Sequence, residues 1–217
     1  MTEAKPGESR QLRERLIQTA CEMNRRGLNQ GTSGNISVRC NEGMLITPSG
    51  VPYEDLSPDS IVLVDEAGRA IGGKPSSEWR FHHDIYAAKS SAAAIVHAHP
   101  RHCTALACLH RSIPAFHYMV AVAGGNDVPL ADYATFGSQA LSDHVIRALN
   151  NRSACLMANH GMVCHASSLS SALDLGCEIE HLAATYLACL AGGEPEILDD
   201  EEMARVLEKF RNYGPPR

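Results

Sequence analysis

Two histidines separated by one residue are the side chains best placed to bind a metal. His97 and His99 follow the apolar run Ala92–Val96, which predicts a buried strand. Side chains on a strand alternate between its faces, so both imidazoles point the same way and can meet on one metal ion. Pro100 cannot donate to a sheet ladder, so it ends the strand and can open a helix. Two unrelated core or surface histidines are the alternative.

A third histidine occupies a similar position. His160 follows the apolar segment 154–157 and precedes Gly161, which places it at a strand end. Three histidine ligands with one position left for water or substrate are typical of a catalytic zinc site. Glu78 could fill that position or act as a base, although a glutamate in the first turn of a helix also simply complements the helix dipole.

Two loops and one helix start contain groups that suit a phosphate. Residues 29–38 run from a loop rich in Gly, Ser, Thr and Asn into a strand, and residues 48–50 read Pro-Ser-Gly. Such loops can surround an anion with N–H groups and hydroxyls, although each alone is also typical of an ordinary turn. Ser76 and Ser77 are good N-caps for a helix predicted from Glu78 to about Lys89, whose N-terminus would attract an anion.

The elements that must position these groups follow from hydrophobic periodicity. We expect strands over residues 36–38, 44–47, 61–64, 92–99, 154–157 and 162–165. Helices are expected over residues 9–26, 78–89, 100–109, 137–149, 169–190 and 199–210. Residues 1–8 are polar and read as a flexible N-terminal tail. Residues 9–217 form one domain in this interpretation, because no repeat or linker divides them.

Composition limits the partners and the compartment. The 217 residues carry a formal net charge of −6, which argues against nucleic acid or an anionic membrane as the main partner. No apolar run approaches a membrane span, and the polar N-terminus is not a signal peptide. None of the eight cysteines forms a Cys-x-x-Cys pair. Reduced thiols in a cytoplasmic protein are therefore the expected state.

Several separate stretches of the chain together resemble the class II aldolase family, with the aldolase/adducin fold, and in particular its L-fuculose-1-phosphate aldolases. The resemblance covers nearly the whole chain and rests on the segments 28–39, 44–50, 75–82, 97–99, 111–119, 133–137 and 208–214. It implies an α/β fold, a single domain whose central, mostly antiparallel sheet is flanked by helices. It also implies a homotetramer, with active sites between subunits.

The resemblance implies a role for each matching residue. His97, His99 and His160 would hold one zinc ion per chain. Glu78 would ligate zinc in the resting enzyme and leave it to act as the base. Tyr118 would reach from a neighbouring subunit to the aldehyde oxygen, and Tyr213 near the C-terminus would close the site. The substrate phosphate would be held by Gly34, Asn35, Ser49, Gly50, Ser76 and Ser77.

The reaction implied is cleavage of a ketose 1-phosphate to dihydroxyacetone phosphate and an aldehyde. Substrates resembling L-fuculose 1-phosphate and 5-deoxypentulose or methylthiopentulose 1-phosphates are all compatible, since residues beside the metal ligands leave the aldehyde half open. A pentulose-phosphate 4-epimerase is the enzymatic alternative. A non-enzymatic, adducin-like assembly module is another, which the intact metal ligands disfavour. A Schiff-base aldolase would need a buried lysine, whereas Lys74, Lys89 and Lys209 occur in polar contexts.

Overall fold

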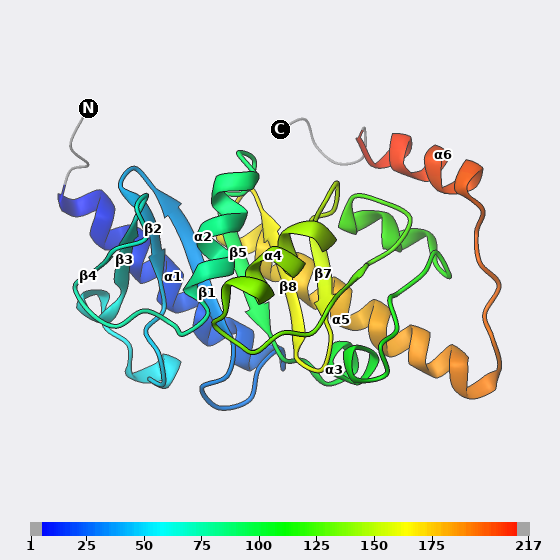
Figure 1. Cartoon of the computed structure of the whole chain (residues 1–217), viewed down its shortest axis with the longest axis horizontal. Helices are drawn as coiled ribbons and strands as arrows, with labels where there is room; N and C mark the ends of the chain where they lie inside the picture. Colours follow the sequence, from blue (N-terminus) through cyan, green and yellow to red (C-terminus); the bar gives the residue numbers. More distant parts are fainter. Residues whose placement is uncertain (1–5, 212–217) are drawn as a thin grey trace.

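An eight-stranded sheet lies at the centre of the structure, a computed structural model that describes residues 6–211 (Figure 1). The strand order is β4-β3-β2-β1-β5-β8-β7-β6. Every pair is antiparallel except β6 with β7. The central, mostly antiparallel sheet expected from the resemblance is thus confirmed. The strands are β1 (Asn35–Cys40), β2 (Gly43–Ile46), β3 (Val62–Asp65), β4 (Ala70–Ile71), β5 (Ala94–Ala98), β6 (Leu130–Ala131), β7 (Ala154–Met157) and β8 (Gly161–Ala166).

Helices cover both faces of this sheet. The α-helices are α1 (Pro6–Arg25), α2 (Trp79–Ala88), α3 (Arg101–Cys108), α4 (Gln139–Ala148), α5 (Leu169–Gly192) and α6 (Asp200–Arg211). Short 3₁₀ helices are η1 (Tyr53–Asp55), η2 (Pro58–Ser60) and η3 (Tyr118–Ala123). Helices α2 and α4 pack together on one face, whereas α1, α3 and α5 lie on the other (Figure 1). No helix within residues 6–211 is long and apolar enough to cross a membrane.

The sequence located each of these α-helices, with boundaries that differ by a few residues. The largest difference is at the N-terminus, where α1 begins at Pro6 rather than at Ser9. Proline lacks an N–H that the first helical turn would leave unpaired, and its fixed φ suits that position. Residues 6–8 are therefore helical, in contrast to the predicted tail, and residues 1–5 lie outside the described part of the chain. Strands β4 and β6 were not predicted, because two residues are too few to show alternation.

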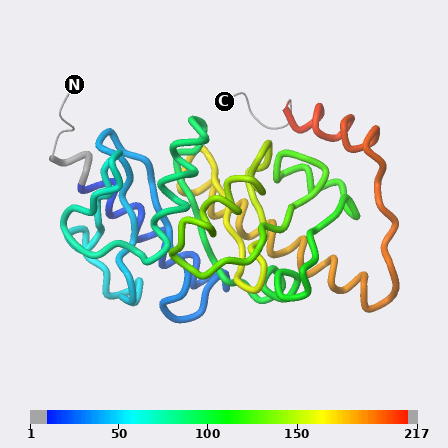
Figure 2. Tube along the Cα trace, in the orientation of Figure 1, coloured from blue at the N-terminus to red at the C-terminus, as the bar shows by residue number. Residues whose placement is uncertain are grey.

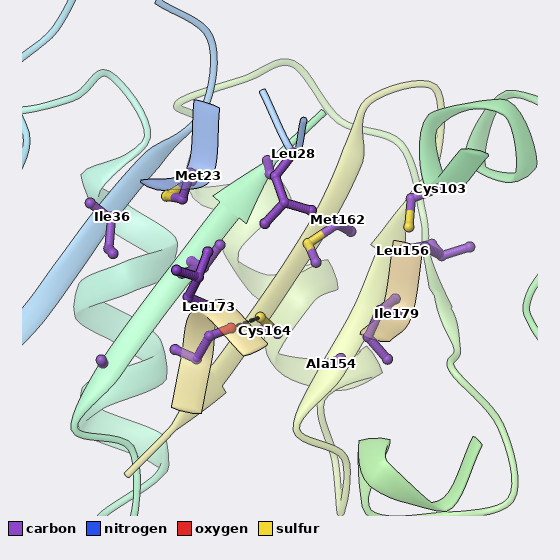
Figure 3. Packing of buried hydrophobic residues seen from close by; sticks show 14 of the residues in the cluster. Met23, Leu28, Ile36, Cys103, Ala154, Leu156, Met162, Cys164, Leu173 and Ile179 are labelled. Carbon is purple, nitrogen blue, oxygen red and sulfur yellow. Dashed lines mark hydrogen bonds between the residues drawn. The ribbon is translucent and has the colours of Figure 1, made fainter. Parts of the chain in front are cut away.

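The alternation of side chains on β5 separates two cores. Ala94, Val96 and Ala98 belong to the core beneath α1, α3 and α5, whereas Ile95 belongs to the core beneath α2 and α4. Figure 3 shows the first core, in which side chains of α1, β1, β8 and α5 pack together. His97 follows the parity of Ile95, and its ring contacts Phe81 of α2 edge-on, with 5.3 Å between ring centroids. The strand therefore directs its histidine toward α2.

The C-terminal helix packs away from the sheet. An extended segment follows α5 and leads to α6 at one end of the molecule (Figure 2). The Leu198 N–H in this segment donates to the Ala115 carbonyl at 2.9 Å. Met203 and Val206 of α6 form a small separate core with Ala115 and Ala121, next to η3. The apolar stretch 113–123 thus ends in η3, held against α6.

Candidate metal centre

Three imidazoles and one carboxylate meet between α2 and the ends of β5 and β7. Nε2 of His97 lies 2.9 Å from Nε2 of His99 and 3.0 Å from Glu78 Oε2. Nε2 of His160 lies 3.1 Å from Glu78 Oε1. One potential ligand atom from each of the four residues lies within 4.8 Å of the other three. The structure therefore brings together the four side chains that the sequence proposed as metal ligands.

The position of Glu78 depends on the turn before α2. Ser76 donates its N–H to the Thr47 carbonyl at 3.0 Å, and its Oγ accepts the Glu78 N–H at 3.3 Å. Helix α2 begins at Trp79, so Glu78 is itself the N-cap residue, one position earlier than the predicted first turn. Its side chain makes no capping hydrogen bond and is directed to the histidines. The prediction that the two serines cap this helix is wrong. The helix begins at Trp79, one residue later than predicted, so Glu78 takes the N-cap position.

Two of the three histidines have hydrogen-bond partners outside the cluster. Nδ1 of His97 lies 2.9 Å from the Met162 carbonyl, a partner that requires Nδ1–H and turns Nε2 toward Glu78. The backbone N–H of His99 donates to the Asn29 side chain at 3.1 Å. Two of the three histidines are thus fixed by partners outside the cluster.

His160 lies in the tight connection between β7 and β8. Asn159 has the left-handed φ of +53° that this connection requires, and Nε2 of His110 lies 2.6 Å from its Oδ1. Gly161 follows because a Cβ there would lie 2.4 Å from the Ala98 carbonyl oxygen and 2.7 Å from His99 Cδ2. The close approach of this connection to the end of β5 therefore requires glycine, and it brings His160 to His99.

The protonation of the cluster favours cation binding. Burial would raise the pKa of Glu78, but electrostatic interaction with His97 and the close contacts of the His160 and His97 rings outweigh burial and hold it well below the usual value. Burial and the charges of His97 and His160 lower the pKa of His99 to about 3, despite the opposing effect of Glu78. An ionised carboxylate and a neutral imidazole are the forms in which these side chains bind metal ions.

The donor set fits zinc. Glu78 is only 6 % exposed, and its Oε1 is buried without a hydrogen-bond partner. A buried carboxylate oxygen is strongly destabilised unless a proton or a cation compensates it. Three imidazole nitrogens and one carboxylate oxygen match the ligands of a catalytic zinc site, in which substrate can replace one ligand. The four residues Glu78, His97, His99 and His160 could therefore hold the ion.

A cavity of about 480 Å³ opens beside the cluster. It is lined by Glu78, His99 and His160, and also by all six residues expected to hold a phosphate: Gly34, Asn35, Ser49, Gly50, Ser76 and Ser77. The same cavity is lined by Tyr133 and Phe136, whose side chains are largely exposed. No site role was predicted for these two aromatics, although their occurrence in a polar loop was a usable signal.

Tyr118, one of the two predicted tyrosines, lies away from this cavity. Tyr118 on η3 is 50 % exposed and lines a different cavity, next to Phe210, with 6.5 Å between ring centroids. It does not line the metal cavity of its own chain. Tyr213 lies outside the described residues.

Other chemistries find no support at this site. Lys74 is exposed and Lys89 donates to the Leu149 carbonyl, and among the described residues no lysine lines the cavity. A Schiff-base mechanism would need such a lysine. All eight cysteines are free thiols, as predicted.

The cluster predicts a stoichiometry of one zinc ion per chain, held by the four residues. His97→Ala removes a fully buried ligand, so we expect the purified variant to lose most of its zinc, as measured by elemental analysis. His165→Ala is the matched control. His165 is likewise a buried strand histidine, on β8, but it lies outside the cluster and contacts the Arg152 carbonyl at 3.3 Å. Equal zinc in His97→Ala and the control would refute the assignment.

Comparisons with known proteins agree with this geometry. The sequence model of the Class II Aldolase and Adducin N-terminal domain matches residues 14–187. The chain is 53 % identical over 210 residues to 5-methylthioribulose-1-phosphate/5-deoxyribulose-1-phosphate aldolase of Rhodospirillum rubrum, covering 96 % of this chain and 95 % of that protein. It is also 53 % identical over 209 residues to L-fuculose phosphate aldolase of Escherichia coli, covering 95 % and 97 %.

Solved structures give the same result. A structure of L-fuculose 1-phosphate aldolase aligns with a TM-score of 0.90 and 38 % identity, covering 96 % of this chain and 98 % of that chain. The L-fuculose-1-phosphate aldolase of Thermus thermophilus aligns with a TM-score of 0.74 and 26 % identity, covering 95 % and 98 %. The chain belongs to the class II aldolase and adducin family.

Proposed function

We propose that this protein is a zinc-dependent aldolase that cleaves a ketose 1-phosphate to dihydroxyacetone phosphate and an aldehyde. The observation that carries the proposal is the single cavity that joins the His97–His99–His160–Glu78 cluster to a set of hydroxyl and amide donors. The relatives are class II aldolases, which are carbon–carbon lyases. When bound, zinc would act as a Lewis acid that stabilises negative charge developing on the oxygens of the substrate.

We assign the phosphate to the part of the cavity formed by the two loops and the start of α2. Its lining offers the hydroxyls of Ser49, Ser76 and Ser77, and the backbone at Gly34 and Gly50. Both glycines have positive φ, at +77° and +73°, a conformation common where N–H groups surround an anion. No lysine or arginine is among the described residues that line the cavity. Neutral donors and the positive end of the α2 dipole would therefore bind the phosphate.

We assign to Glu78 the proton transfer at carbon C3 of the substrate. During cleavage the C4 hydroxyl loses its proton, the C3–C4 bond breaks, a carbonyl forms at C4, and C3 gains a proton. Glu78 is the acidic side chain lining the cavity among the described residues, and we assign it the transfer at C3. Such acid–base catalysis contributes about two to four orders of magnitude in rate.

The aldehyde end of the site is proposed to be shared between subunits. Tyr133 and Phe136 supply aromatic surface at the mouth of the cavity, which suits a short apolar tail on the substrate. Tyr118 is half exposed beside an apolar groove of its own. We propose a homotetramer in which Tyr118 reaches a neighbour's cavity and acts on the aldehyde oxygen, with Tyr213 closing the site. The free thiols agree with a cytoplasmic enzyme.

A panel of ketoses tests the activity and the phosphate site together. L-fuculose 1-phosphate, 5-deoxyribulose 1-phosphate and 5-methylthioribulose 1-phosphate are each supplied with their unphosphorylated forms, and dihydroxyacetone phosphate and free aldehyde are assayed. We expect cleavage of at least one phosphorylated ketose. Ser76→Ala should raise its KM much more than the KM of the unphosphorylated ketose, because only the phosphate loses a partner. Equal effects on both forms would place Ser76 outside the phosphate site.

The same panel separates the alternatives. A 4-epimerase would convert a pentulose phosphate without releasing free aldehyde. An assembly module would act on none of the compounds while still forming oligomers. Either result would contradict the proposed cleavage.

Replacing Glu78 tests its role as the base. Glu78→Gln keeps the size of the side chain but removes its capacity to take up a proton. We expect the variant to fold and to retain zinc, while hydrogen exchange at the reacting carbon of dihydroxyacetone phosphate in deuterated water falls by about two to four orders of magnitude. Exchange is followed by NMR, with His165→Ala as a control, because His165 contacts the Arg152 carbonyl and lies outside the cavity. Undiminished exchange would assign the proton transfer to another group.

Mixed oligomers test the contribution of Tyr118. If His97 and Tyr118 of different chains complete one site, His97→Ala and Tyr118→Phe should each be impaired as homo-oligomers. Co-refolding the two variants should restore part of the activity, because some sites then contain an intact residue from each chain. The double variant refolded alone is the control and should recover nothing. Absence of recovery in mixed oligomers that are shown to form would mean that Tyr118 does not serve a neighbour's site.

A further inference from the structure

A ladder of polar side chains runs between β1 and α2, away from the metal centre. On β1, Asn35 and Ser37 are two residues apart and point to the α2 face, whereas Ile36 and Val38 point to the opposite core. Two residues of strand advance about 6.6 Å, and four residues of helix advance about 6 Å. A β1 residue every second position can therefore meet an α2 residue every fourth position, in step.

The α2 side of the ladder is Glu78, His82 and Tyr86, spaced four residues apart. The Tyr86 hydroxyl lies 2.9 Å from Ser37 Oγ, which lies 2.7 Å from Nδ1 of His82. Nε2 of His82 lies 2.5 Å from Oδ1 of Asn35, whose Nδ2 donates to Glu78 Oε2 at 3.1 Å. All five side chains are buried, and the four contacts form one continuous chain.

The orientation of the Asn35 amide fixes which atom donates in each hydrogen bond of this chain. Asn35 donates its Nδ2–H to Glu78 Oε2 and presents its oxygen to His82, and an amide oxygen can only accept. Nε2 of His82 must then carry the proton, and Nδ1 must accept from the Ser37 hydroxyl. Tyr86 must finally donate to Ser37. Burial and the nearby charge of His97 lower the pKa of His82 to about 3, which agrees with a neutral ring.

The far end of the chain is fixed independently. The Arg39 guanidinium donates to the carbonyls of Tyr86 and Lys89 at 2.7 and 3.0 Å, and lies 4.7 Å from the centre of the Tyr86 ring. It therefore anchors the C-terminal end of α2 to β1, on the same side of the strand as the ladder. The chain of hydrogen bonds therefore begins at Tyr86, next to this anchored helix end, and ends at Glu78.

We propose that Asn35 and His82, aligned by Ser37 and Tyr86, are positioning residues that fix the Glu78 carboxylate, with Oε2 anchored and Oε1 left for the metal or the transferred proton. This rests on the proposed role of Glu78 as the base. Oε1 is buried without a hydrogen-bond partner, whereas Oε2 accepts from Asn35, so the two oxygens are already distinguished. The ladder is not a proton relay, because the Asn35 amide separates His82 from Glu78 and an amide does not readily pass a proton on.

The direction of the chain can be observed without activity. In protein labelled with ¹⁵N-histidine, NMR should show His82 as the neutral tautomer with its proton on Nε2 and with Nδ1 as an acceptor. Loss of this signal in His82→Gln assigns it. A proton on Nδ1, or a charged ring at neutral pH, would overturn the proposal whether or not the protein is an aldolase.

Kinetics of two variants separate positioning from packing. His82→Gln can still donate an amide N–H to Asn35, whereas His82→Leu fills similar space without a donor. We expect kcat of His82→Leu to fall about 10- to 100-fold, the typical effect of losing a partner of a metal ligand. The KM for the phosphorylated ketose should be unchanged, and His82→Gln should recover most of the lost rate. His165→Gln is the control for a buried histidine outside the ladder and should resemble wild type.

Each remaining outcome has a meaning. Equal kcat in His82→Leu and wild type, or equal loss in His82→Leu and His82→Gln, would reduce His82 to a packing role. If His82→Leu does not fold, Ser37→Ala tests the next hydrogen bond of the same chain. We expect a smaller loss of kcat for this variant, and an unchanged kcat would contradict the proposal. If Glu78→Gln retains full exchange but the His82 tautomer is as described, the ladder stands as a structural feature and the assignment of the base fails.

Discussion

Burial of the Glu78 carboxylate is the constraint on which the rest of the site depends. An ion in a buried position is tolerated only when other groups compensate its lost hydration. Here Oε2 has Asn35 and His97, whereas Oε1 has His160 nearby but no hydrogen bond. The lack of a hydrogen-bond donor at Oε1 is the reason that the cluster suits a cation. The same lack explains why a carboxylate stands at the start of α2 without capping that helix.

The sheet satisfies this constraint through the parity of its strands. On β5, Val96 and Ala98 fill the core beneath α5, so His97 must face α2. On β1, Ile36 fills the same core, so Asn35 must face Glu78. A one-residue shift of β5 would put an apolar side chain at the metal cluster and His97 in the core, and the same shift of β1 would put Asn35 in the core. The large hydrophobic core therefore fixes the register that a precise polar site requires.

The sequence predicted much of this arrangement, for identifiable reasons. Strand alternation before His97 and His99 gave their common direction, and the apolar strand before His160 gave its place at a strand end. Boundaries near Glu78 were less certain, because Ser76, Ser77 and Glu78 are all acceptable near a helix N-terminus and only the tertiary contact of Ser76 with Thr47 decides between them. The spacing of Glu78, His82 and Tyr86 was visible too, but its partners on β1 could not be paired without the fold.

An amide is a suitable group to stand between Glu78 and the buried histidine. A lysine or arginine in place of Asn35 would add a charge that competes with the metal for the carboxylate. A serine or a second histidine could donate, but it could also accept and pass a proton, which would let the base lose its proton into the ladder. Asn35 supplies one N–H to Oε2 and keeps a second that can reach the cavity it lines. The side chain can thus orient the base and still face a bound anion, which explains how a residue expected at the phosphate comes to be 2 % exposed and hydrogen-bonded to Glu78.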